Sequence, residues 1–319
     1  MSSAPRKYRT EFALNIYSAE PAMVSPANLD NFVYESEEAK AQIKNSNIYI
    51  ILKRPRIAFI PGSLSIKDRE VIGELSIQLE DKAPTFPFSI HGQLPDKIAS
   101  VTALKYPYTK LTLLYADGEP AMTYPFAYLM RNLRAELNGL NNQEVVYVGQ
   151  AFGAAGERSA IERLSSHSTL QKILADITAN EPHMEVLLAL YSFGFHRFFL
   201  SMDGTVPVQI DGDADRQHYQ QVLESQFKRS MRISLAEAAL IRYFEPKYNK
   251  IYKTGFPHQR YKILQKLFEF DFAGLIVEAS VEDHGMRLYS QKRQPNFHHI
   301  AKFDLHDKTA RKSFFFDEP

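Results

Sequence analysis

Short apolar runs separated by turn-forming residues dominate the first 120 residues of the chain. They are rich in Ile, Leu, Tyr and Phe, and they cover residues 12–17, 47–54, 56–62, 74–80 and 110–116. Runs of this length and composition, bounded by Pro, Gly, Ser, Asn or Asp, are typical of β-strands. The clearest helical stretch among them is 28–45, with Asn or Asp near its start and acidic residues in its first half. We therefore predict a β-rich N-terminal domain over residues 1–120.

The pattern changes after a turn-rich stretch at 116–125. The predicted elements that follow are strands at 126–132, 144–150 and 183–193 and helices at 159–178 and 234–246. The first two strands are interpreted as a hairpin with a long connection. The second helix starts behind Ser234 and ends at Pro246, because a proline ring cannot continue a helix.

The last part of the chain returns to a mixed pattern, with a helix-like stretch at 260–270 and strand patterns at 273–281 and 285–291. The fold class predicted from these patterns is α+β. Three domains are expected: 1–120, 121–253, and a C-terminal extension over 254–319.

Composition narrows the possible chemistry. The 319 residues include no cysteine, which excludes disulfides, thiolate zinc sites and a cysteine nucleophile. The start of the sequence lacks an apolar signal segment, and Gly194, His196 and Arg197 interrupt the longest apolar run, residues 184–200. We therefore expect neither export nor a membrane span, and we expect a cytoplasmic location.

Charge is distributed unevenly, although the formal net charge is only +1. Ten Lys or Arg and two acidic residues lie between Gln226 and Lys266, so that segment carries a net charge of +8. Tyrosine and phenylalanine residues are interleaved with the cations. This combination is typical of surfaces that neutralise phosphates and stack on bases, and it indicates a nucleic-acid partner.

Four short motifs occur in a distinctive order. The strand at 144–150 contains Tyr147-Val148-Gly149, and the next predicted helix carries Arg163 and His167. The second helix carries Glu237, and Pro246 and Asn249 follow. In order and spacing, residues 124–252 resemble the GIY-YIG nuclease superfamily.

The resemblance implies a three-stranded antiparallel sheet flanked by helices, and an active site built from the motifs. Tyr128 or Tyr147 would help to deprotonate the attacking water, and Arg163 would stabilise charge on the phosphate. His167 would lie near the attacking or leaving oxygen, and Asn249 would support the site. Glu237 would bind Mg²⁺, with Mn²⁺ as a substitute, because hard cations prefer anionic oxygen ligands.

Two assignments have alternatives. The first motif of the superfamily is Gly-Ile-Tyr, whereas this region offers Phe126-Ala127-Tyr128, so Tyr124 competes with Tyr128. Arg158 competes with Arg163. Arg163 is preferred because His167 follows it four positions later, and residues i and i+4 share one face of a helix.

Glu237 also has a purely structural interpretation. It follows Ser234 by three residues, and Ser-x-x-Glu is the pattern of a capping box, in which the glutamate caps a backbone N–H.

The function predicted from the sequence is a Mg²⁺-dependent endonuclease that hydrolyses phosphodiester bonds in DNA, with RNA left open. Lys247, Lys250 and Lys253 are expected to contact the phosphates, and the N-terminal domain is expected to select the substrate or a partner. By analogy, restriction or phage defence is the expected role. The alternative is a nuclease-like DNA-binding protein without activity, which the altered first motif would indicate.

Overall fold

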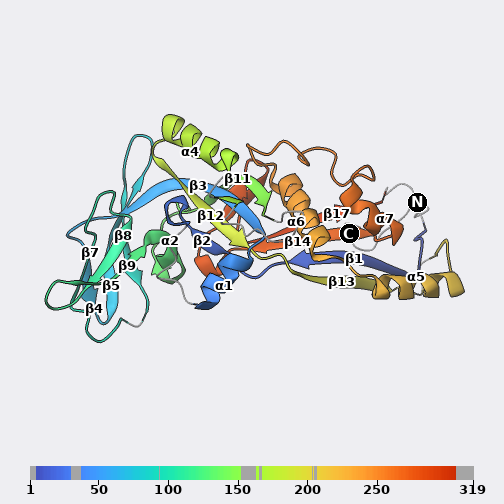
Figure 1. The fold of residues 1–319 in the computed structure, drawn as a ribbon, viewed down its shortest axis with the longest axis horizontal. Helices are drawn as coiled ribbons and strands as arrows, with labels where there is room; N and C mark the ends of the chain where they lie inside the picture. The colour runs from blue at the N-terminus through green and yellow to red at the C-terminus, as the bar shows by residue number, and fades with distance from the viewer. Residues whose placement is uncertain are drawn as a thin grey trace.

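The structure is a computed structural model that describes residues 5–29, 37–92, 94–151, 163–164, 167–202, 204 and 207–306. Within these residues the strands form sheets that lie side by side along the long axis of the molecule (Figure 1). Helices pack on the central and right-hand parts of this arrangement (Figure 1). The predicted α+β class is confirmed.

The central sheet is built around β3 (Ile48–Phe59). β11 (Gln143–Gln150) and β12 (Met184–Tyr191) pair with it in antiparallel fashion on its two sides. The short strand β2 (Ala22–Val24) extends the sheet beyond β12. The strands predicted at 144–150 and 183–193 are thus present, but both pair with a strand from the first 60 residues.

The partner strand predicted at 126–132 is wrong. This stretch forms the helix α2 (Phe126–Leu129) and the 3-10 helix η2 (Met130–Asn132), which follow Pro125. Its buried positions are Phe126, Ala127, Leu129 and Met130. This spacing matches one face of a helix rather than the alternation of a strand.

β3 continues through Pro55, where the sequence pattern predicted two separate strands. The Arg56 N–H donates to His183 O at 2.9 Å, on the side of β12. The Pro55 nitrogen therefore faces the opposite side, where β11 begins only at Gln143 and pairs no further than Lys53. A proline is tolerated in a strand where its missing N–H has no partner to bond.

The two faces of the central sheet are covered by different helices. On one face, α4 (Ser168–Asn180) contributes Leu170, Ile173 and Ile177 to a buried cluster with Tyr49 and Ile51. On the other face, α6 (Arg229–Phe244) contributes buried alanines and leucines to the large core that contains Ile50 and Val148. Alternate residues of β3 therefore serve different cores, as the period of a strand requires.

Residues 60–142, here called the β3–β11 connection, contain strands of their own. These are β4 (Ser65–Lys67), β5 (Glu70–Gln78), β6 (Thr85–Ile90), β7 (Ser100–Thr102), β8 (Lys110–Leu114), β9 (Pro120–Pro125) and β10 (Leu133–Arg134). β5 pairs with the last four residues of β3, and β7, β8 and β9 form a separate antiparallel sheet. The connection occupies the left-hand end of the molecule (Figure 1).

A second sheet joins the beginning and the end of the chain. Its order is β13 (Phe195–Met202), β1 (Thr10–Tyr17), β14 (Gly274–Ser280) and β17 (His298–Asp304). The short strands β15 (Leu288–Ser290) and β16 (Arg293–Asn296) extend the central sheet beyond β11. Strands from both sides of the expected boundaries at 120 and 253 therefore share sheets.

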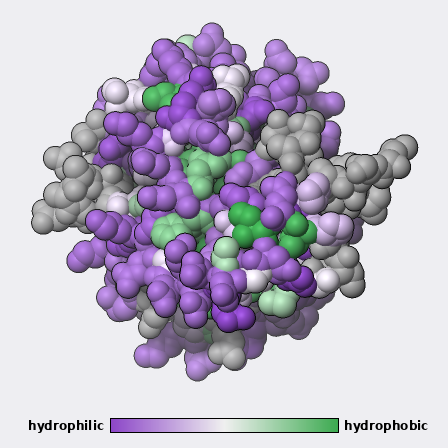
Figure 2. All heavy atoms as spheres, turned by 90° about the vertical axis from the view of Figure 1, so that its right-hand side faces the viewer, coloured by the Kyte–Doolittle hydropathy of each residue, from purple (hydrophilic) through white to green (hydrophobic). Residues whose placement is uncertain are grey.

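Helices α1 (Glu37–Asn45), α5 (Asp213–Glu224) and α7 (Gln265–Glu269) and the 3-10 helices η1 (Pro26–Asn28), η3 (Lys262–Leu264) and η4 (Glu282–His284) complete the described elements. Figure 2 views the right-hand end of Figure 1, where a small apolar area lies among hydrophilic side chains. On β13 and α5, the exposed apolar residues are Phe195, Leu200, Met202 and Leu223. In the described part of the chain, no helix combines the length and apolar character needed to cross a bilayer.

Candidate active site

Beyond its short pairing with β15, the outer edge of β11 is covered by the segment that follows α6. The Tyr248 N–H donates to Val146 O at 3.1 Å. One residue later, the Asn249 carboxamide accepts from Val148 N at 2.9 Å and donates to Val148 O at 2.8 Å. The buried Asn249 side chain thus replaces a neighbouring strand. These two hydrogen bonds fix the backbone of Val148, between Tyr147 and Gly149.

Gly149 leaves room for an aromatic ring. It lies directly opposite Tyr49 in the pairing of β11 with β3. A Cβ atom at residue 149 would lie 2.5 Å from Tyr49 Oη and 2.8 Å from Tyr147 Cε1, which are distances that packed atoms do not reach. The missing side chain therefore allows the two tyrosine rings to lie over the same stretch of β11, with their centroids 6.1 Å apart.

His167 connects this ring pair to α4. It is the N-cap residue of α4, and its Nδ1 accepts from Leu170 N at 3.3 Å. Nδ1 therefore carries no proton, so in the neutral ring Nε2 carries one. Nε2 lies 3.1 Å from Tyr49 Oη and donates to it, and the ring centroid lies 5.7 Å from that of Tyr147.

The prediction that Arg163 and His167 lie on one helix is wrong. Arg163 and Leu164 are helical, but His167 has an extended backbone and precedes the first residue of α4. Both side chains nevertheless influence the same tyrosine. Arg163 is exposed, and it acts on Tyr49 through its charge and a hydrogen bond. Arg158, the alternative to Arg163, lies outside the described residues.

Burial governs the proton equilibria of the cluster. It raises the pKa of both the Tyr49 and the Tyr147 hydroxyls and lowers the pKa of His167. The charge of Arg163 opposes the rise at both tyrosines, and a hydrogen bond from Tyr49 opposes it at Tyr147. The negative charge of Glu237 acts in the other direction and raises both tyrosine pKa values.

Glu237 lies in the middle of α6 rather than at its start. The helix begins at Arg229 with Lys228 as its N-cap, so the capping-box interpretation with Ser234 does not hold. Instead, both residues contact the end of β11. Glu237 Oε1 accepts from Gln150 N at 3.0 Å, and Ser234 Oγ donates to Gln150 Oε1 at 3.3 Å. The carboxylate is therefore held beside the strand that carries Tyr147.

Burial also raises the pKa of the Glu237 carboxyl to about 7. The hydrogen bond from the Gln150 N–H and the charge of Arg163 lower this pKa, but their effect is smaller than that of burial. A carboxylate in this environment gains when a cation neutralises it. Among the described residues, no three His, Cys, Asp or Glu side chains are grouped to hold a metal ion. A single carboxylate can hold Mg²⁺ when water or phosphate oxygens supply the other ligands.

Tyr128 lies elsewhere. It is on α2, where its ring stacks on that of Tyr124 with centroids 5.4 Å apart. It also lines a cavity of about 130 Å³ together with Met23, Arg131 and His284. α2 contacts β2, at the edge of the central sheet away from β11.

Tyr49 is the residue that sequence reasoning missed. Its position beside Tyr147 is the one expected of Tyr128 or Tyr124. The signal was present, because Asn47-Ile48-Tyr49 differs from Gly-Ile-Tyr only at its first residue. It stands about 100 positions before Tyr147, far beyond the usual length of a hairpin loop.

The predicted phosphate-binding lysines follow α6 directly. Lys247 and Lys250 are exposed and flank Tyr248 and Asn249, which lie along β11. Lys253 is half-buried, and its carbonyl accepts from Arg242 at 2.8 Å. Three further cations of the +8 segment (Lys228, Arg229 and Arg232) lie at the other end of α6, roughly 20 Å away along the helix axis. These six cations therefore form two groups, one at each end of α6.

Comparisons with protein-family models, with curated proteins and with solved structures found no match for this chain. The geometry of the site is therefore the basis of the functional argument.

Gly149→Ala tests the packing of the tyrosine pair. The added methyl group would overlap Tyr49, so the free energy of unfolding should fall by about 1–3 kcal/mol, the usual cost of overpacking a core. Gly194→Ala is the matched control, because a Cβ there has no atom within 4 Å. Chemical denaturation would measure both. Equal stability of Gly149→Ala and the parent protein would contradict the position of the Tyr49 ring.

The pKa of Glu237 predicts a pH-dependent stability in metal-free protein. Between pH 4.5 and about 7 the folded protein holds a proton that the unfolded chain releases, so stability should decrease as pH rises. Glu237→Gln removes this titration. The free energy of unfolding of the variant should be close to that of the parent protein at about pH 5. At about pH 8 it should exceed that of the parent protein by on the order of 2 kcal/mol. Unfolding curves in EDTA would measure the difference, and a constant difference would exclude the raised pKa.

Proposed function

We propose that this protein is a Mg²⁺-dependent endonuclease of the GIY-YIG type that hydrolyses phosphodiester bonds in DNA. One observation carries the proposal. Tyr49, Tyr147, His167 and Glu237 come from four separate elements and meet at the end of β11, with Arg163 acting on the same groups.

The resemblance of the motifs supports the proposal more strongly with Tyr49 in place of Tyr128. Asn47-Ile48-Tyr49 and Tyr147-Val148-Gly149 are then antiparallel neighbours, with Tyr49 facing Gly149. The departure from the family pattern is reduced to Asn47 in place of glycine. The Asn47 side chain has a structural role of its own, because its Oδ1 accepts from Phe193 N at 3.0 Å.

Glu237 would hold the cation, which would polarise a phosphate oxygen and acidify bound water. The role of the carboxylate follows from its burial. Its charge raises the pKa of Tyr147, and neutralisation of that charge removes one cause of the rise. A deprotonated Glu237 without a cation therefore opposes ionisation of Tyr147.

Tyr147 is the residue assigned to proton transfer from the attacking water. It is half-buried, whereas Tyr49 is fully buried, so Tyr147 is the tyrosine that can face a substrate. Tyr49 is a positioning residue. It accepts from His167, and its hydrogen bond to Tyr147 favours the phenolate, as the charge of Arg163 also does.

Arg163 has the geometry and exposure suited to the phosphate. A guanidinium can donate to two phosphate oxygens at once and stabilise the charge that develops on them. Lys247 and Lys250 extend the positive surface past Asn249, where the backbone of the DNA would continue.

Tyrosine variants test the site against the assignment made from the sequence. Tyr147→Phe should slow the nicking of supercoiled plasmid by at least about 10²-fold, the usual contribution of a proton-transfer group. Tyr49→Phe should also slow it. Because the hydrogen bond from Tyr49 lowers the pKa of Tyr147, its loss should raise that pKa, and the residual activity of the variant should increase toward higher pH. Tyr128→Phe, the matched control, should nick at the parental rate. A loss confined to Tyr128→Phe would show that the site lies elsewhere.

Glu237→Gln tests the metal role. It preserves the size of the side chain and its ability to accept from Gln150 N, but removes the charge. Cleavage with Mg²⁺ or Mn²⁺ should fall by at least about 10²-fold, while DNA affinity in EDTA stays close to that of the parent protein. Parental cleavage by the variant would contradict the metal site. Metal-dependent DNA binding without cleavage by the parent protein would favour the inactive DNA-binding alternative.

A further inference from the structure

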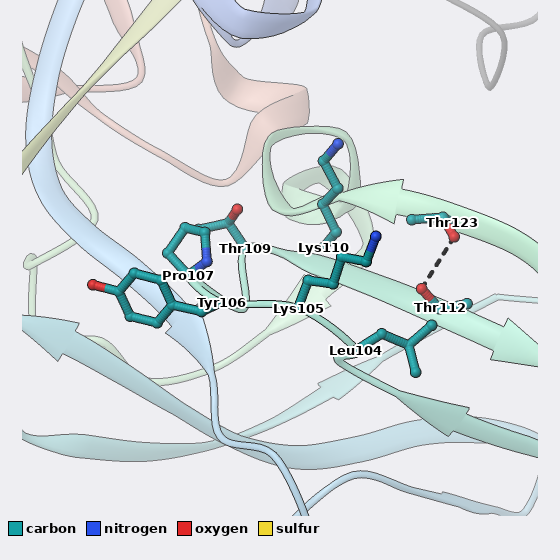
Figure 3. A pocket seen from close by; sticks show the side chains of 8 residues that line it. All are labelled: Leu104, Lys105, Tyr106, Pro107, Thr109, Lys110, Thr112 and Thr123. Atoms are coloured by element: carbon teal, nitrogen blue, oxygen red, sulfur yellow. Dashed lines mark hydrogen bonds between the residues drawn. The ribbon is translucent and has the colours of Figure 1, made fainter.

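The β3–β11 connection contains a cavity that the proposed active site does not use. It has a volume of about 460 Å³ and lies on β8 and the turn before it (Figure 3). Two lysines and three threonines line it, together with Leu104, Tyr106 and Pro107. No acidic residue is among the described residues that line it. We call it the β8 groove.

The charge and exposure of the groove suit a polyanion. Figure 3 shows the ammonium groups of Lys105 and Lys110 on the same side of the turn, with the Tyr106 ring extending away from them. Tyr106 is 85% exposed, which is unusual for an aromatic side chain that serves only the fold. Cations, hydroxyls and an exposed ring at one place are the groups that contact phosphate and sugar in nucleic-acid complexes.

The turn that carries these residues is firmly attached to β3. Tyr108 N donates to Lys105 O at 2.8 Å, which closes the turn, and Phe59 N donates to Tyr108 O at 2.9 Å. The Tyr108 ring packs against the main core. The groove is therefore fixed to the last residue of the strand that carries Tyr49 near its start.

β3 sets the distance between the groove and the tyrosine pair. Phe59 follows Tyr49 by ten positions along β3, and at about 3.3 Å per residue this is a distance of about 33 Å. The Phe59 N–H points to the same side of β3 as the missing N–H of Pro55, which is the side of β11. With one base pair for every 3.4 Å or so of duplex, this distance corresponds to about nine or ten base pairs, close to one helical turn.

We propose that the β8 groove binds the backbone of duplex DNA about one helical turn from the cleaved phosphodiester. A duplex returns the same face to the protein after one turn, so both sites can contact it from one side. The proposal rests on the proposed function for the kind of substrate. Its test measures DNA binding without cleavage, so the groove proposal and the proposed function can be contradicted independently.

The test compares Lys105→Ala/Lys110→Ala with the matched control Lys82→Ala/Lys302→Ala, both in a Glu237→Gln background in EDTA. Lys82 and Lys302 are exposed and lie outside the groove, so the control removes the same charge. With a duplex of about 24 base pairs, the groove variant should bind at least about fivefold more weakly. The slope of log affinity against log salt should be shallower by about 2, for two phosphates no longer neutralised. The control should match the background protein.

A length series and a single-stranded arm identify the ligand. With a duplex of about 8 base pairs, too short to reach from the tyrosines to the groove, the groove variant should bind like the background protein. An equal loss on short and long duplexes would overturn the spacing, and a loss confined to single-stranded DNA would overturn the duplex assignment. Unchanged affinity for every oligonucleotide would show that the groove faces another partner, such as a protein, and would overturn the proposal.

Discussion

The position of β3 between β11 and β12 is the constraint on which the rest of the structure depends. Residues 48–52 are completely buried, because helices cover both faces of the sheet and strands pair on both sides. A strand in this position is apolar throughout rather than alternating. Where the apolar run ends, the buried Lys53 and Arg54 are paired with carboxylates from β11, β12 and the end of α4, with distances of 2.7–3.1 Å. A buried charge without such partners would be costly.

The burial that stabilises the sheet also disfavours the charged forms of the ionisable groups in the site. Tyr49, Tyr147, His167 and Glu237 all have pKa values displaced toward their neutral forms, and desolvation is the largest cause at each. Arg163 is the cation that acts on all four groups. The site is thus suited to receive charge from outside, which is what a metal ion and a phosphodiester would bring. A substrate would also exclude the remaining water.

Local features of the fold followed from the sequence, whereas the long-range pairing did not. The apolar runs at 144–150 and 273–281 form β11 and β14, and Pro246 lies just beyond the end of α6. Strand patterns do not specify partners, so the hairpin partner of β11 was placed in the nearest apolar stretch. The i, i+4 argument for His167 failed because it assumed an uninterrupted helix. The sequence pointed to Tyr147 and Glu237 because their motifs are local, and it did not point to Tyr49 because the strand that pairs with it is distant along the chain.

The β3–β11 connection replaces what would otherwise be the short turn of a hairpin. Loop closure depends only on the logarithm of length, so lengthening a loop from about four to about 80 residues costs only about 3 kcal/mol. The folded strands of the connection offset part of this cost through their own core, which includes Val71, Leu75 and Phe88. The connection joins two adjacent strands, and it does so at the end of their pairing where Lys53 lies opposite Glu144. Residues 60–142 can therefore change in length or content during evolution while the tyrosine pair, at the opposite end of the β3–β11 pairing, keeps its place.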